Sequence, residues 1–244
     1  MMLFDKLGEI ERPAPPRKAA LVFAALTAVL LIASAVLQFR ASAARWIDFG
    51  RTVEGNELSV ESDQYDYYFP DGEFFPLENT AFPLGIALMI QALGLLCLLA
   101  TLAALRERST RAILFTALPL GVLAAIGFAL LGLHALLSAL EGQPSALPGS
   151  GLFHLALLIG FLALCALSIL CCLSVPLLGL AAAFLLGSTL VGYFLSSYLL
   201  APLLAGYVSH PTTPGTETIV ALSTAAAAIT MLSVLISLAS QRRK

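Results

Sequence analysis

The chain has 244 residues, of which 59% are hydrophobic and 11% are charged, and its mean hydropathy is +0.92. Soluble domains contain about 25% charged residues, so this composition excludes an ordinary soluble protein. The formal net charge of −2 conceals an uneven distribution, because the charged residues are confined to the two ends of the chain and to the segments between long apolar stretches.

Six apolar stretches contain none of the 13 Lys and Arg and none of the 15 Asp and Glu residues. A bilayer core about 30 Å thick needs roughly 20 apolar helical residues, and each stretch supplies that length. The sequence therefore predicts an all-α polytopic membrane protein with six transmembrane helices. The predicted helices cover residues 19–39, 83–105, 112–140, 151–173, 176–200 and 218–240.

The first stretch, residues 19–39, is longer than the apolar core of about 7–15 residues in a secretory signal peptide. We therefore expect a retained membrane anchor. The small-residue triplets Ala33–Ala35 and Ala41–Ala43 leave cleavage as the alternative, which would reduce the number of spans to five.

The fourth and fifth stretches are separated only by Ser174 and Val175. A continuous helix across both would be far too long for a single span, and Pro176 favours the start of a new helix. We therefore predict a tight turn at 172–176.

Ten of the 13 basic residues lie in the tail 1–18, the turn 106–111 and the tail 241–244. Six alternating spans place these three segments on one side of the membrane, which the positive-inside rule assigns to the cytoplasm. We expect a protein of the plasma (inner) membrane with both termini cytoplasmic. The outer loops are then 40–82, 141–150 and 201–217, and the apolar start of the last loop allows a re-entrant segment.

The outer loop 40–82 contains nine acidic and three basic residues and is rich in aromatic residues, so it differs from an acidic disordered segment. Its Pro70–Gly72 sequence lies between two runs that favour strands, 65–69 and 73–77. This pattern predicts a β-hairpin with the glycine in the left-handed conformation. A second turn is predicted at 54–56, so the loop should form a small antiparallel sheet on the outer ends of the helices.

Four acidic residues of this loop are candidate ligands of a calcium ion, because Ca²⁺ prefers carboxylate oxygens. Their spacing does not match an EF-hand, so we expect a solvated acidic surface and no metal. The four candidates are Asp63, Asp66, Asp71 and Glu73.

Two histidines, His134 and His154, lie near the outer ends of the third and fourth predicted helices. These helices are antiparallel neighbours, so the two rings can face each other, as a bis-histidine haem or a metal site requires. The alternative that we favour is a pair of interfacial histidines bound to backbone or water, with no cofactor.

Small residues at four-residue spacing predict faces on which helices pack closely within the membrane. We expect internal packing of the bundle, with a dimer interface as the alternative. Gln91 is the one amide well inside a predicted span and is expected to bridge helices. The small-residue positions are Ala117, Gly121, Ala125 and Ala129 in the third helix and Gly179, Ala183 and Gly187 in the fifth.

Motifs of hydrolases, zinc proteases and phosphate-binding loops are absent from the sequence. We therefore expect a non-enzymatic accessory or scaffold subunit of a bacterial envelope complex. Its expected partners are the lipid bilayer and other membrane or envelope proteins, and no nucleic acid. The topology resembles that of ABC-2-type exporter permeases, which implies a transport permease working with a separate ATPase as the alternative. An envelope enzyme that uses the acidic loop is a third possibility.

Overall fold

The computed structural model describes residues 18–52, 60–105, 108–209 and 212–243, and these residues form helices and loops without a β-strand. Five of the helices are long and apolar enough to cross a membrane, and a sixth crossing is possible if a bent helix pair counts as one span. The long helices are α1 (Lys18–Ala43), α4 (Ala81–Ala104), α5 (Arg108–Glu141), α6 (Gly151–Cys172) and α10 (Thr216–Arg243).

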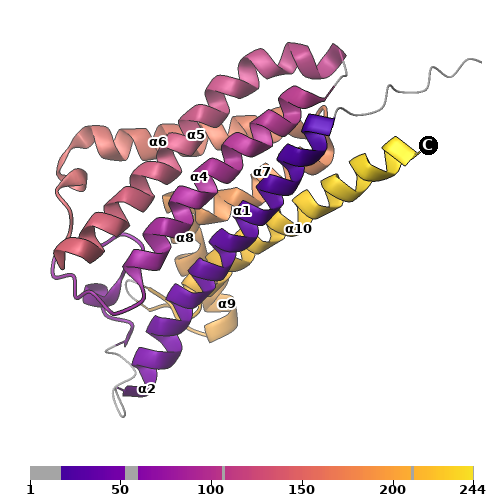
Figure 1. Cartoon of the computed structure of the whole chain (residues 1–244). Coiled ribbons are helices and arrows are strands. Elements are labelled where there is room, and N and C mark those ends of the chain that lie inside the picture. The colour runs from indigo at the N-terminus through magenta and orange to yellow at the C-terminus, as the bar shows by residue number, and fades with distance from the viewer. Residues whose placement is uncertain (1–17, 53–59, 106–107, 210–211, 244) are drawn as a thin grey trace, which may run out of the picture.

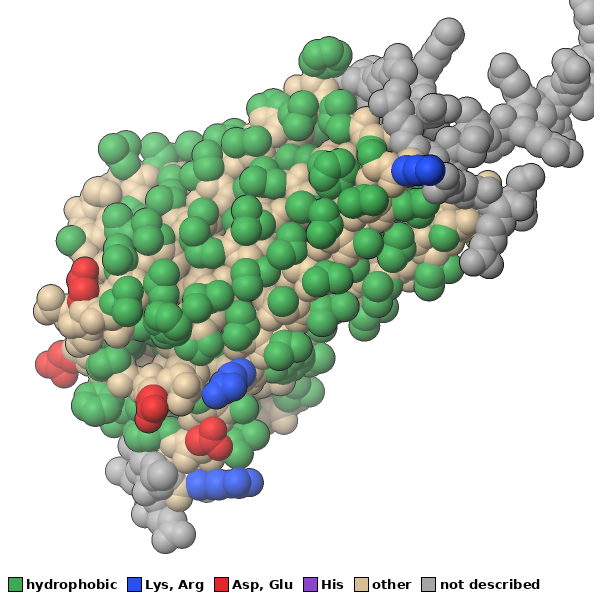
Figure 2. Space-filling view, viewed as in Figure 1, with side chains coloured by type: hydrophobic (Ala, Val, Ile, Leu, Met, Phe, Trp, Pro, Cys, Tyr) green, Lys and Arg blue, Asp and Glu red, His purple; other side chains and the backbone are tan. Residues whose placement is uncertain are grey.

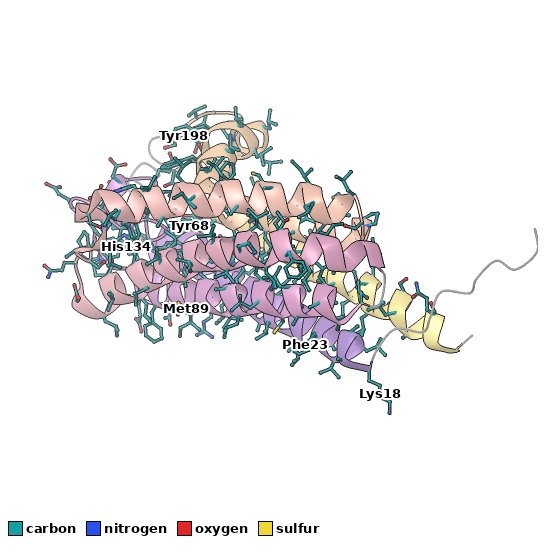
Figure 3. All side chains as sticks on the ribbon, turned by 90° about the horizontal axis from the view of Figure 1, so that it is seen from above. Lys18, Phe23, Tyr68, Met89, His134 and Tyr198 are labelled. Atoms are coloured by element: carbon teal, nitrogen blue, oxygen red, sulfur yellow. The ribbon has the colours of Figure 1, made fainter. Side chains whose placement is uncertain are left out.

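The helices pack side by side as a bundle (Figure 1). Their contacts close a ring: α1 contacts α4, α4 contacts α5, α5 contacts α6, α6 contacts α7 (Pro176–Phe184), α7 contacts α10, and α10 returns to α1. Lys18 lies at one end of the bundle, whereas Tyr68 and His134 lie towards the other (Figure 3). We call these the terminal end and the loop end, because the loop 60–80 covers the second.

Helix α1 continues beyond the predicted boundary at residue 39. It passes directly into a π-helix, η1 (Ala44–Phe49), and a short helix, α2 (Gly50–Thr52). The buried positions of α1 recur every three or four residues and continue to Arg45. The helix persists because the side chain of Arg45 is buried and fully hydrogen-bonded at the loop end.

The helix expected at 176–200 is not continuous. Residues Pro176–Ser188 and Leu190–Ala205 are two helical segments bent by 70°. We call Leu190–Ala205 the arm; it projects from the side of the bundle, where Figure 3 labels Tyr198. The segment comprises α7 (Pro176–Phe184), η4 (Leu185–Ser188), α8 (Leu190–Leu195), η5 (Ser196–Leu200) and α9 (Ala201–Ala205).

The β-hairpin predicted between 65–69 and 73–77 is wrong, since the loop residues 60–80 form only a 3₁₀ turn, η2 (Asp63–Tyr65), and irregular structure. Consecutive residues of a strand point to opposite faces, but Tyr67 and Tyr68 are both only 1% exposed. A two-stranded hairpin lying on the helices would bury only one of these rings, so the burial of both does not fit the predicted hairpin. The glycine of the predicted turn does have a positive φ of 55°, whereas the turn predicted at 54–56 lies outside the described residues.

Hydrophobic side chains cover the side of the bundle seen in Figure 2, and charged side chains lie at its two ends. This distribution is the one that a bilayer requires of a helical bundle, because the hydrocarbon core cannot solvate charges. The described residues therefore form a helical bundle with several helices that are apolar and long enough to cross a membrane.

Candidate functional site

The loop end contains a buried ion pair. Arg45 is 0% exposed and Glu217 is 3% exposed, and the guanidinium Nη1 lies 2.8 Å from Glu217 Oε1. Trp46 Nε1 donates to the other carboxylate oxygen at 2.6 Å, and Arg45 also donates to the carbonyl of Val60 at 3.1 and 3.0 Å. Glu217 lies in the first turn of α10, where the helix dipole favours a negative charge. The pair therefore joins η1, the loop and α10.

A second carboxylate, Asp66, lies beside this ion pair. One oxygen accepts a hydrogen bond from the backbone N–H of Tyr68, and the other accepts one from the hydroxyl of Tyr193, each at 2.9 Å. The Tyr193 hydroxyl is also 3.1 Å from Thr212 Oγ1. Burial raises the pKa of Asp66 to about 6, although the positive charge of Arg45 opposes this shift. The carboxyl group of Asp66 therefore titrates well above its ordinary range.

Tyr67 places an unpaired hydroxyl in the same region. It is the buried side-chain polar atom that has no hydrogen-bond partner among the described residues. Burial raises the pKa of the Tyr67 hydroxyl. The negative charges of Glu217 and Asp66 raise this pKa further, whereas the positive charge of Arg45 lowers it. An unsatisfied buried hydroxyl costs about 1–3 kcal/mol, so this group is available to a hydrogen-bonding ligand.

Tyr68 explains why the fifth helix breaks. In an uninterrupted helix the carbonyl of Ser188 would accept the N–H of Gly192. Here the Ser188 carbonyl accepts the hydroxyl of Tyr68, while the Gly192 N–H donates to Thr189 Oγ1 at 3.0 Å. Thr189 is thus the N-cap of α8, and Gly192 is required because a Cβ there would collide with the backbone of residues 186 and 187.

Polar side chains of α1, α4, η4 and α10 meet next to this break. Gln91 Nε2 donates to Ser188 Oγ at 2.5 Å, and its Oε1 accepts from Gln38 Nε2 at 3.0 Å. Ser34 and Thr224 donate to the same oxygen at 3.4 and 3.3 Å. Gln91 lies ten residues into α4, about 15 Å from the helix start at 1.5 Å per residue. Its position at this centre agrees with its expected role as a bridge.

These residues form a series of polar contacts, which we call the polar column, in which the covalent frames of Tyr68 and Ser188 connect successive hydrogen bonds. It leads from Asp66 through the backbone and hydroxyl of Tyr68 to Ser188, and from Ser188 to Gln91 and Gln38. The column connects the loop surface with the middle of the bundle.

The four predicted calcium ligands line one open pocket of about 520 Å³ at the loop surface. Asp63, Asp71 and Glu73 are exposed there, whereas Asp66 lies at the boundary with the buried ion pair. No three His, Cys, Asp or Glu side chains within the described ranges are placed to hold a metal ion. The pocket therefore brings the four carboxylates to one surface.

His134 and His154 share an aromatic cluster with Phe69 and Phe153, in which ring centroids lie 5.1–6.1 Å apart. His134 is fully buried and uses both ring nitrogens: Nε2 is 3.0 Å from the carbonyl of Pro70, and Nδ1 is 2.8 Å from Ser145 Oγ. Because a carbonyl can only accept, Nε2 carries the hydrogen and Nδ1 accepts from the serine. His134 therefore fastens the loop to α5, and its lone pair is not free for haem ligation.

The predicted small-residue faces lie at helix contacts. A Cβ at Gly121 would meet Leu99 of α4, one at Gly179 would meet the backbone of Cys172, and one at Gly187 would meet Ser223 of α10. Ala117 and Ala125 are buried, while Ala129 and Ala183 are half-buried. The closest helix approach that the sequence analysis missed joins Gly85 of α4 to Gly132 of α5.

Sequence analysis also missed Arg45, Glu217 and Tyr193. A signal existed for the first, because Gln38, Ser42 and Arg45 continue the buried spacing of α1. Comparison with family models, curated proteins and solved structures finds no match for this chain.

Proposed function

We propose that the chain is a plasma-membrane protein of a bacterium with six spans, in which α7 and the arm together form the fifth. Its terminal end faces the cytoplasm and its loop end faces outwards. The excess of basic residues in the segments at the terminal end supports this orientation. In this arrangement the arm lies in the outer leaflet, where its exposed Leu203 and Leu204, 81% and 78% accessible, contact lipid.

We further propose a non-enzymatic role as an accessory or scaffold subunit of an envelope complex, with the loop end as the docking surface. The observation that carries this proposal is the attachment of residues 60–80 to the helices. Val60 is bound by Arg45, Asp66 by Tyr193, and Pro70 by His134. A surface held rigid in this way loses little conformational entropy when a partner binds.

The chemistry of this surface defines the partner. The loop exposes Asp63, Asp71, Glu73 and Glu78 to solvent, together with Phe75, which is 57% exposed. An aromatic anchor surrounded by carboxylates fits a protein surface that offers an apolar pocket with Lys or Arg at its rim.

Site-specific photo-crosslinking in native membranes tests the proposal. A photoreactive residue at Phe75 should yield one defined protein adduct, identified by mass spectrometry. The matched control is Leu158 of α6, which is 48% exposed on the side of the bundle and should react with lipid only. Lipid or water adducts alone at Phe75 would contradict a docking role.

The interrupted fifth helix favours a second candidate, a permease with the topology of ABC-2-type exporters. Broken helices within a membrane are tolerated where protein buries them, and transporters use them at their binding sites. Here the break at Ser188 is held by Gln91. Purification from native membranes in mild detergent discriminates the candidates, because a permease should bring a stoichiometric ATPase with it and a scaffold a different partner.

A further inference from the structure

The buried Arg45 and Glu217 and the half-buried Asp66 together carry unbalanced charge at the loop end. Arg45 is paired with Glu217 at 2.8 Å, which neutralises both. Asp66 has no hydrogen bond from a basic side chain among the described residues, and its two donors are the neutral Tyr68 N–H and Tyr193 O–H. The ionised set therefore contains one cation and two carboxylates, and a low-polarity site disfavours the extra negative charge.

The other charged groups around Asp66 do not neutralise the extra negative charge. Among the residues that the structure describes, Arg45 from η1 supplies the positive charge that acts on Asp66, whereas Glu217 from α10 is negative. The carboxylates of Asp63, Asp71 and Glu73 line the pocket on its open side. These exposed carboxylates concentrate cations, including protons, at the entrance to the site.

A second observation at the same place is the unpaired hydroxyl of Tyr67. Tyr67 is 1% exposed, and its hydroxyl interacts electrostatically with the charges of Glu217, Arg45 and Asp66. A buried hydroxyl of this kind can hydrogen-bond an incoming water molecule, which is the carrier that delivers a proton to a carboxylate.

We propose that Asp66 is a proton-binding site reached from the loop-end pocket, and that its occupancy controls the hydrogen bond by which the loop holds α8. A hydronium ion in the pocket transfers its proton to Oδ2 of Asp66 and becomes water, so one O–H bond breaks and one forms. The hydroxyl of Tyr193 ends its donation to Asp66, turns to donate to Thr212 Oγ1, 3.1 Å away, and accepts the new O–H of Asp66. No other covalent bond changes.

Protonation changes the strength of this attachment. A hydrogen bond to an ionised group is about twice as strong as one between neutral groups. The ionised state therefore holds Tyr193, and with it α8, more tightly to the loop, although the buried charge itself is unfavourable. The raised pKa of Asp66, about 6, places the change in the range of mildly acidic surroundings. This inference does not depend on the docking role proposed above.

Infrared spectroscopy of the full chain in phosphatidylethanolamine–phosphatidylglycerol vesicles tests the site. The carbonyl band of a protonated carboxyl group should titrate with an apparent pKa of about 6. The band should be lost in Asp66→Asn and retained in Asp71→Asn, which alters an exposed carboxylate of the same pocket. Persistence of the titration in Asp66→Asn overturns the proposal.

Tyr193→Phe provides a test that does not require the asparagine variant to fold. This change removes a hydrogen bond to the ionised carboxylate, so the apparent pKa must shift upwards from about 6. An unchanged or lowered pKa would contradict the assignment. In vesicles with one protein orientation, the titration must also follow the pH on the loop side; a response to the other side refutes access through the pocket.

Discussion

The two halves of the bundle satisfy their polar groups in different ways. Near the terminal end, hydroxyl groups bond to the carbonyl four residues earlier in their own helix. Thr27, Thr101, Ser168 and Thr230 all do so, at 2.7–2.9 Å. Near the loop end, polar side chains bond across elements: Gln38 bonds to Gln91, 53 residues away, and to Thr224, 186 residues away. Hydrogen bonds between elements therefore fix the arrangement of the loop half, whereas the packing of side chains fixes the arrangement of the terminal half.

Helix regularity follows the same division. The π-helices η1 and η5 and the 3₁₀ turn η4 are all close to the polar contacts of the loop half. At Ser188, a tyrosine hydroxyl from the loop replaces a backbone donor, which is a known cause of helix breaks. Polar contacts from outside a helix thus set where these helices bend.

Glu217→Gln should have the largest effect, because it removes the carboxylate that the buried Arg45 contacts at 2.8 Å. Breaking a buried pair by removing one partner costs about 3–5 kcal/mol. Reversible unfolding in mixed micelles measures the loss. The double change Arg45→Met with Glu217→Leu should be less destabilised than the single change, and Arg51→Gln, at an exposed site, should be neutral. An equal loss in the single and double variants would contradict the importance of the pair.

Gly179→Ala tests whether shape governs the terminal half. The added Cβ would collide with the backbone of Cys172, and overpacking costs typically about 1–3 kcal/mol. Gly149→Ala is the control, because a Cβ there meets nothing within 4 Å. The same unfolding assay applies, and equal stabilities of the two variants would show that α6 and α7 can separate without penalty.

Gln91→Leu should cost less, about 0.6–2 kcal/mol, which is the range for hydrogen bonds between helices in membranes. Its matched partner is Thr101→Val on the same helix, which removes a bond within the helix at 2.9 Å and no bond between helices, so it should cost less than Gln91→Leu. If both changes cost the same, the distinction between the two halves fails.

Local sequence signals located the apolar helices, the close packing at Gly121, Gly179 and Gly187, and the left-handed glycine at position 72. The sequence signal for each of these features comes from residues that are near one another in the chain, even where the packing partner lies on another helix. The bend at Ser188 depends on a tyrosine 120 residues earlier, and the ion pair joins residues 172 apart. No periodicity of one segment encodes such partners.

The failed hairpin shows how burial overrides a turn signal. The Pro70–Gly72 turn residues are correct for a hairpin, but the flanking run contains Tyr67 and Tyr68, and both rings are drawn into the bundle. Tyr68 stacks on Tyr193 with ring centroids 4.4 Å apart. Packing against helices thus determined a loop whose local pattern favoured strands.

The last prediction concerns pH, because the stability of the protein should depend on the protonation of Asp66. Asp66 has a pKa of about 6 in the folded protein against an ordinary value of 3.8, so the folded state binds this proton more tightly. Stability is therefore lost as the pH rises from about 4 through about 6, and it remains lower above that window. Thermal unfolding in detergent should show a lower midpoint at pH 7 than at pH 5. Asp66→Asn should remove this difference while Asp63→Asn keeps it, and a midpoint that rises over the same interval would show that the raised pKa of Asp66 does not govern the dependence of stability on pH.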